Sequence, residues 1–141
     1  MTEDTSSFYD QIDELARAHS RFRRESYFFI YSALDHTVRN LRRDRKEEAS
    51  GRHVTGQELC LGIAEYGRTQ FGPLVRSVFH HWGIRTTADF GEIVFTLVDH
   101  GLMSKTEEDR DEDFADIYDF DDVFDPRKIQ SDSLDLDLEA F

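Results

Sequence analysis

The side chains best suited to metal binding or acid–base chemistry are six histidines and one cysteine. No two histidines stand four residues apart, and neither an H-E-x-x-H motif nor a paired-cysteine spacing is present. His80 and His81 are adjacent, so on a helix they point about 100° apart and do not share one ion unaided. We therefore expect no metal site and no cofactor, and we expect the histidines to lie at surface or half-buried positions.

Asp35 and His36 form one acid–base pair, but the local sequence places no nucleophile beside them. Cys60 falls on the apolar stripe of its expected helix, which favours a core position over catalysis. Glycine-rich nucleotide-binding loops and the G-x-S-x-G motif are both missing from the sequence. These features predict a protein that is not an enzyme, with chemistry at Asp35 and His36 as the alternative.

An acid-rich stretch, DRDEDFADIYDFDD, covers residues 109–122. Calcium loops of the EF-hand type need a central glycine for the sharp turn and a glutamate that closes a twelve-residue spacing. Both are missing here, so the stretch predicts a weak cation site at most.

The elements that must position these groups are helices. Apolar residues recur at helical spacing along most of the chain. Thr55 and Glu58 fit a capping box, Gly72 and Pro73 separate two helices, and Gly83 and Gly101 are helix stops. The five expected helices span residues 7–22, 25–43, 55–72, 73–83 and 86–101.

The last three of these helices have the order of a helix-turn-helix core. Residues 102–105 and 114–120 flank an acidic turn, so they predict a small β-wing and a winged-helix-like fold. Residues 114–124 also fit one or two helical turns packed on the core. We expect a mainly α single domain over residues 1–125, followed by an acidic tail over residues 126–141.

The formal net charge of −13 is unevenly spread along the 141 residues. Residues 1–105 carry 14 basic and 15 acidic side chains, a net of −1, and residues 106–141 carry 3 and 15, a net of −12. The overall charge argues against partners rich in phosphate. Residues 17–52 hold ten basic and five acidic side chains, and this basic front weakens that exclusion. The lone cysteine, the absence of a signal peptide and the lack of a long apolar run predict a cytoplasmic protein without a membrane partner.

A winged helix suggests DNA binding, and the charges of this chain exclude the usual mode. The expected wing carries six acids and one base. Phosphates and base edges are normally met there by arginine, lysine or amide side chains. The expected recognition helix also carries no lysine or arginine. Its expected exposed residues are Asp89, Glu92, Thr96, Asp99 and His100.

Two functions remain from different classes. The first is a non-enzymatic protein-interaction or regulatory module whose acidic-aromatic segment, residues 113–125, binds a basic partner. Its anchors would be Tyr118, Phe120, Val123 and Phe124, and the competing interpretation is that these side chains cover the core. The second is a nucleic-acid binder gated by the acidic tail. Its basic patch would consist of Arg39, Arg42, Arg43, Arg45 and Lys46.

Four sequence blocks carry a resemblance: HVTGQEL at residues 53–59, FGPLVRSVFHHWGI at 71–84, DFGEIVFTLVDHGL at 89–102 and DFADIYDFDDVFD at 113–125. The chain resembles, over residues 8–125, a small bacterial family of conserved hypothetical proteins from planctomycetes and verrucomicrobia. The resemblance implies that residues 113–125 belong to the domain and that a variable tail begins at Pro126. The family has no established activity, so the resemblance assigns no functional residues.

Overall fold

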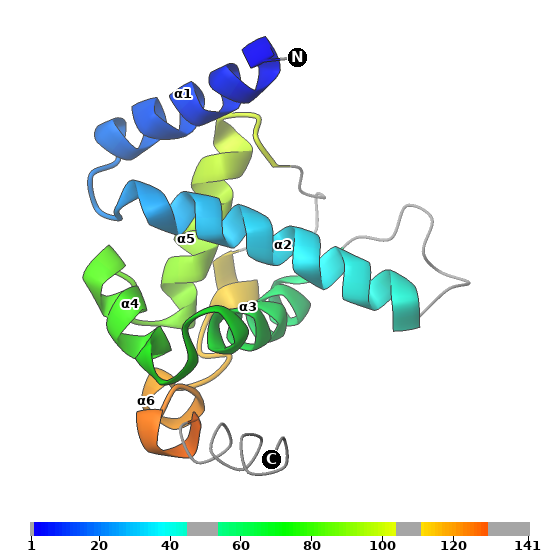
Figure 1. The fold of residues 1–141 in the computed structure, drawn as a ribbon, viewed down its shortest axis with the longest axis vertical. Helices are drawn as coiled ribbons and strands as arrows, with labels where there is room; N and C mark the ends of the chain where they lie inside the picture. The colour runs from blue at the N-terminus through cyan, green and yellow to red at the C-terminus, as the bar shows by residue number, and fades with distance from the viewer. Residues whose placement is uncertain (1, 45–53, 104–110, 130–141) are drawn as a thin grey trace, which may run out of the picture.

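The computed structural model describes residues 2–44, 54–103 and 111–129, and this part of the chain is mainly helical (Figure 1). The predicted fold class, mainly α with about five helices, is confirmed. The α-helices are α1 (Thr2–Ala18), α2 (Arg24–Asp44), α3 (Gly56–Phe71), α4 (Val75–Trp82), α5 (Thr87–Asp99) and the short α6 (Phe120–Val123). The part of the chain that the structure describes also contains the 3-10 helices η2 (Gly72–Leu74) and η3 (Asp111–Phe114).

The turn residues act as the sequence predicts. The backbone N–H of Glu58 donates to Thr55 Oγ1 over 3.1 Å, and the N–H of Thr55 donates to Glu58 Oε1 over 3.0 Å, which completes the capping box of α3. Gly83 ends α4 with φ of +94°, in the left-handed region that favours glycine. α1 begins earlier than predicted, at Thr2. It also ends earlier, because the chain leaves the helix after Ala18 to form the turn into α2.

Helix α5 lies at the centre of the fold, where it packs against α2 and η3 (Figure 1). A Cβ atom at Gly91 would lie 2.8 Å from side-chain atoms of Phe114, so this glycine allows η3 to approach α5 closely. The buried residues of α5 are Thr87, Asp89, Phe90, Gly91, Ile93, Val94 and Leu97.

Phe79 of α4 is the hub of the aromatic core and is completely buried. Its ring centroid lies 5.3–6.0 Å from those of five other aromatic side chains, a spacing typical of edge-to-face and tilted ring pairs. These neighbours come from α2, from α4 itself, from α5 and from the segment around α6. They are Phe29, Trp82, Phe90, Phe120 and Phe124.

The predicted β-wing is absent from the described residues. Where the second strand was expected, residues 114–120 finish η3, pass through a turn and enter α6. Thr87 Oγ1 donates to the carbonyl oxygen of Phe114 over 2.6 Å and accepts from the N–H of Ile117 over 3.1 Å. The helical alternative for this segment is therefore confirmed, because its backbone bonds to α5 instead of to a partner strand. Most of the expected acidic turn, residues 104–110, lies outside the described residues.

Packing continues past the predicted domain boundary at residue 125. Residues 126–129 are helical, and the side chain of Ile129 is buried. The remainder of the predicted tail, residues 130–141, lies outside the described part of the chain. No helix in the described ranges has both the length and the apolar character to cross a membrane.

Candidate functional site

The four predicted anchors of the acidic-aromatic segment do not share one environment. Phe120 and Phe124 are buried, with exposed fractions of 3% and 0%, and both rings contact Phe79. Tyr118 and Val123 are half-buried. The first two side chains are therefore core residues and are not available to a partner in this structure. The competing interpretation of these aromatics, that they cover the core, holds for both.

Tyr118 ties the same segment to helix α3. Its hydroxyl donates to the carbonyl oxygen of Cys60 over 2.7 Å, and burial raises the pKa of Tyr118 well above its ordinary value. Cys60 is a free, buried thiol on the core-facing side of α3. This position agrees with the core assignment made from the apolar stripe.

We predict that Cys60 is unreactive in the native protein. Burial raises the pKa of the Cys60 thiol to about 12, so at about pH 8 the nucleophilic thiolate is nearly absent. Iodoacetamide labelling followed by mass spectrometry should show modification in denaturant and almost none without it; fast labelling of folded protein would contradict the burial. The folded thiol ionises at higher pH than the unfolded one, so its contribution to stability is complete below the ordinary pKa and declines as the pH rises toward 12.

The face of α5 does not have the form of a recognition helix. Asp89, expected on its exposed surface, is 6% exposed. Its carboxylate accepts from the N–H groups of Arg85 and Thr86 over 2.8 and 3.2 Å, and from the guanidinium of Arg21 over 2.9 Å. The prediction of an exposed Asp89 was wrong, because this side chain caps α5 and ties it to the turn between α1 and α2.

The structure describes one side chain of the predicted basic patch, that of Arg39. Arg39 lies on the exposed side of α2, and its Nε is 3.1 Å from Asp35 Oδ2. An ion pair of this kind, four residues apart on a helix surface, is worth about 0.3–0.5 kcal/mol. The remaining members lie beyond the described side chains: Arg42, Arg43, Arg45 and Lys46.

The Asp35–His36 pair does not form an acid–base dyad. His36 Nε2 instead lies 2.8 Å from Glu65 Oε1 of α3, and the Asn40 amide donates to the same oxygen over 3.0 Å. The His36 ring also packs on Tyr66, with centroids 5.1 Å apart. This group links α2 to α3 at the surface. Among the side chains that the structure describes, no three potential metal ligands from histidine, cysteine, aspartate and glutamate come together.

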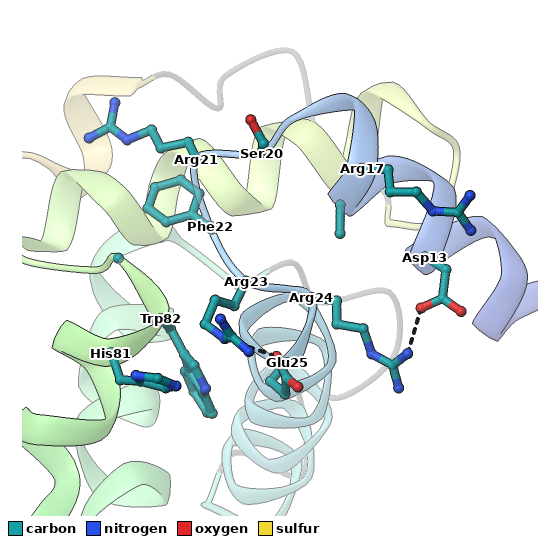
Figure 2. Close-up of a pocket in the computed structure, with 12 residues that line it drawn as sticks. Asp13, Arg17, Ser20, Arg21, Phe22, Arg23, Arg24, Glu25, His81 and Trp82 are labelled. Carbon is teal, nitrogen blue, oxygen red and sulfur yellow. Dashed lines mark ion pairs between the residues drawn. The ribbon is translucent and has the colours of Figure 1, made fainter.

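A basic hollow of about 680 Å³ lies where the turn between α1 and α2 meets the end of α4 (Figure 2). Phe22 and Trp82 line it but are largely buried, and Asp13 and Glu25 contribute the acidic groups of the lining. We call this feature the arginine hollow. Its defining residues are Arg17, Arg21, Arg23, Arg24, His81 and Trp82.

Backbone contacts hold the turn against α4. The N–H of Arg23 donates to the carbonyl oxygen of Trp82 over 3.1 Å. A Cβ atom at Gly83 would lie 2.8 Å from the carbonyl oxygen of Arg21, so the close approach requires glycine as well as the positive φ. The sequence places three arginines in RFRR at residues 21–24, and these contacts bring Arg23 beside His81 and Trp82 (Figure 2).

Two of the four arginines are held in place by other side chains. Arg21 lies 2.9 Å from Asp89 and 3.1 Å from Glu92, and its guanidinium sits 5.1 Å from the centroid of the Phe22 ring. Arg24 lies 3.0 Å from Asp13. These two arginines therefore connect the α1–α2 turn to α5 and to α1.

The other two arginines are weakly engaged. Arg23 is exposed, and its Nε is 3.8 Å from Glu25, near the limit for an ion pair. Arg17 is exposed, and no described carboxylate lies within ion-pair distance of its guanidinium. The cationic groups do not converge on one point: in Figure 2 the guanidinium groups of Arg17 and Arg21 point to opposite sides, and those of Arg23 and Arg24 lie between them. Such a distribution suits a ligand with several negative charges along its length.

An exposed aromatic cluster adjoins the hollow through Arg24, whose guanidinium lies 5.8 Å from the centroid of the Phe28 ring. The rings of Phe8 and Tyr31 are 4.9 Å apart, and those of Tyr9 and Phe28 are 5.2 Å apart. Tyr9 and Tyr31 are 50% and 39% exposed. The aromatic cluster, defined by Phe8, Tyr9, Phe28 and Tyr31, therefore extends the hollow along α1 and α2.

Sequence reasoning counted these arginines in the basic front but assigned them to no site. The available signal was the clustering of three arginines between two amphipathic helices. The contribution of His81 and Trp82 from α4, about sixty residues later, has no signal in the local sequence.

Comparisons with known proteins add no relative: no family model, no curated protein and no solved structure matches the chain.

Proposed function

We propose that this protein is a non-enzymatic interaction or regulatory module that binds an acidic segment of a partner protein. The observation that carries the proposal is the arginine hollow with the aromatic cluster beside it, joined by the contact between Arg24 and the Phe28 ring. Arginine and tyrosine are enriched at the centres of protein interfaces, where their long or flat side chains supply most of the binding energy. The burial of Phe120 and Phe124 moves the proposed contact surface away from the acidic-aromatic segment.

The charge of the surface selects the partner. The lining holds four arginines and the carboxylates of Asp13 and Glu25, and Arg21 is also paired with Asp89 and Glu92. The positive charge open to a partner is therefore that of Arg17 and Arg23. A partner with several carboxylates would gain from this charge, and a basic partner would be repelled. The proposal therefore replaces the basic partner expected from the sequence with an acidic one.

Nucleic acid is the second candidate, because exposed tyrosines beside arginines can stack bases while the cations meet phosphates. The net charge of −13 opposes any anionic partner at long range, and it opposes nucleic acid more than an acidic protein segment because the charge density of nucleic acid is higher. We rank it second, both for this surface and for the patch at residues 39–46.

The proposal places the module in the cytoplasm, where its lone, buried thiol would remain reduced. It also retains the resemblance to the planctomycete and verrucomicrobial family, for which an interaction module is a compatible role.

Charge reversal at Arg17 and Arg23 tests the proposal. Both side chains are exposed and weakly engaged, so the double variant Arg17→Glu/Arg23→Glu should change stability by about 0.5 kcal/mol or less at each site. Nuclease-treated affinity purification from the native host, read by mass spectrometry, should recover acidic proteins with the natural chain and lose them with the variant. Arg39→Glu, on the far end of α2, is the matched control and should retain them.

Two results would overturn the proposal. The first is recovery of the same proteins by the natural chain and the double variant. The second is binding of single-stranded DNA or RNA that falls steeply with salt and disappears in the double variant, which would assign the surface to nucleic acid.

A further inference from the structure

The chain carries an acidic segment of the kind that the arginine hollow would bind. Residues 131–139, SDSLDLDLE, contain four acids and no lysine or arginine. The acids Asp135 and Asp137 alternate with Leu134, Leu136 and Leu138. In an extended conformation, successive side chains point to opposite sides, so this pattern separates carboxylates from leucines.

We propose that residues 131–139 dock intramolecularly in the arginine hollow. The inference rests on the proposed function and names a competitor for the same surface: the acidic partner must displace the chain's own acidic segment. Carboxylates of the segment would meet Arg17 and Arg23, the two exposed and weakly engaged arginines of the hollow.

The path from the last described residues to the hollow is short. The Phe124 ring, next to the end of α6, is 5.3 Å from Phe79, and the Phe79 ring is 6.0 Å from Trp82 in the hollow. Helix α4, which carries Phe79 and Trp82, has eight residues and so a length of about 12 Å. The chain beyond Ile129 adds twelve residues, enough to span up to about 40 Å when extended. Part of that length is used as the linker, so the acids late in the segment, Asp135, Asp137 and Glu139, are the ones that can reach the hollow from the same molecule.

Charge complementarity favours the hollow over Arg39, the one member of the basic patch whose side chain the structure describes. Arg39 of the patch already pairs with Asp35, whereas Arg17 has no described carboxylate partner and the carboxylate nearest to Arg23 is 3.8 Å away. Tethering also raises the local concentration of the segment to the millimolar range, so a weak contact is enough for docking.

The chain supplies a spectroscopic pair for the test. Trp82 is the only tryptophan and lies in the hollow, so it is a unique fluorescence donor. Cys60 is buried, so Ala140→Cys can be labelled selectively with an acceptor fluorophore in the folded, full-length protein. Energy transfer from Trp82 to the label then reports the position of the acidic segment.

Three changes should each cause loss of transfer: Arg17→Glu/Arg23→Glu, neutralisation of the four acids to amides, and about 1 M salt, which screens exposed charges beyond a few ångströms. Arg39→Glu should leave the transfer unchanged. If the reversal perturbs folding by circular dichroism, Arg17→Gln/Arg23→Gln replaces it, with a smaller loss expected.

Transfer that is insensitive to the hollow variants and to salt would overturn the proposal, as would transfer that is lost with Arg39→Glu. Transfer that falls when labelled chains are diluted with unlabelled ones would assign the contact to a second copy and would also overturn it. Partner recovery in the purification experiment is scored separately. A docked segment without partners and partners without docking are therefore distinct results.

Discussion

Replacement of Phe124 by alanine is expected to lower the free energy of unfolding by about 3–5 kcal/mol. The Phe124 side chain is completely buried and contacts the rings of Phe79, Tyr118 and Phe120. Its removal would leave a cavity in the aromatic core, so the cost includes both lost burial and lost contacts. Chemical denaturation followed by circular dichroism measures the change.

Two controls separate a core role from a general effect of substitution near the end of the chain. Phe124→Leu keeps most of the apolar volume and should cost much less, about 1–1.5 kcal/mol. Val123→Ala changes the half-buried neighbour and should also have a small effect. A fully stable Phe124→Ala protein would remove the segment from the core and restore Phe124 as a candidate partner anchor.

Asp89→Ala is expected to have the second largest effect, a loss of about 3 kcal/mol, because it removes a helix cap and a buried charged hydrogen-bond acceptor together. The carboxylate serves two backbone N–H groups at the start of α5 and the guanidinium of Arg21. Without it, α5 loses the Asp89 half of its capping box, while Thr86 remains as the N-cap, and the turn that carries the arginine hollow loses its ion pair with α5. Thermal or denaturant unfolding should show the loss.

Two related variants separate the contribution of the backbone hydrogen bonds from that of the ion pair with Arg21. Asp89→Asn keeps a hydrogen-bond acceptor and removes the charge, so it should retain part of the cap and lose the ion pair. Glu92→Gln removes the exposed partner of the same arginine and should cost about 1 kcal/mol or less, as exposed ion pairs do. Equal stability of the natural chain and Asp89→Ala would mean that the carboxylate faces solvent.

The starts and ends of helices could be predicted from short stretches of the sequence. Thr55 with Glu58 and glycine at position 83 specify a helix start and a helix end through backbone hydrogen bonds and φ, which depend on a few consecutive residues. The apolar stripe that places Cys60 in the core works in the same way. For this reason the mainly α class and the approximate bounds of the five helices were predictable.

The conformation of the segment around α6 could not be predicted from its local sequence. Phe114, Phe120 and Phe124 fit either a strand beside a turn or a helical cover, because the aromatic side chains bury well in both. The choice depends on Thr87, which bonds the segment's backbone, and on Gly91, which admits Phe114. Both lie on α5, more than twenty residues away in the chain, so only the tertiary structure decided the outcome.

The arginine hollow also depends partly on the sequence alone and partly on the tertiary structure. The sequence by itself determined that arginines gather before α2 and that acids gather at the end of the chain, since the type and number of each residue are given by the sequence. The tertiary structure decided which arginines are already neutralised, Arg21 by Asp89 and Arg24 by Asp13, and which are left for a ligand. It also brought Trp82 under them. Electrostatic pairing acts over a few ångströms in space, and distances of that kind are set by packing between elements far apart in the sequence.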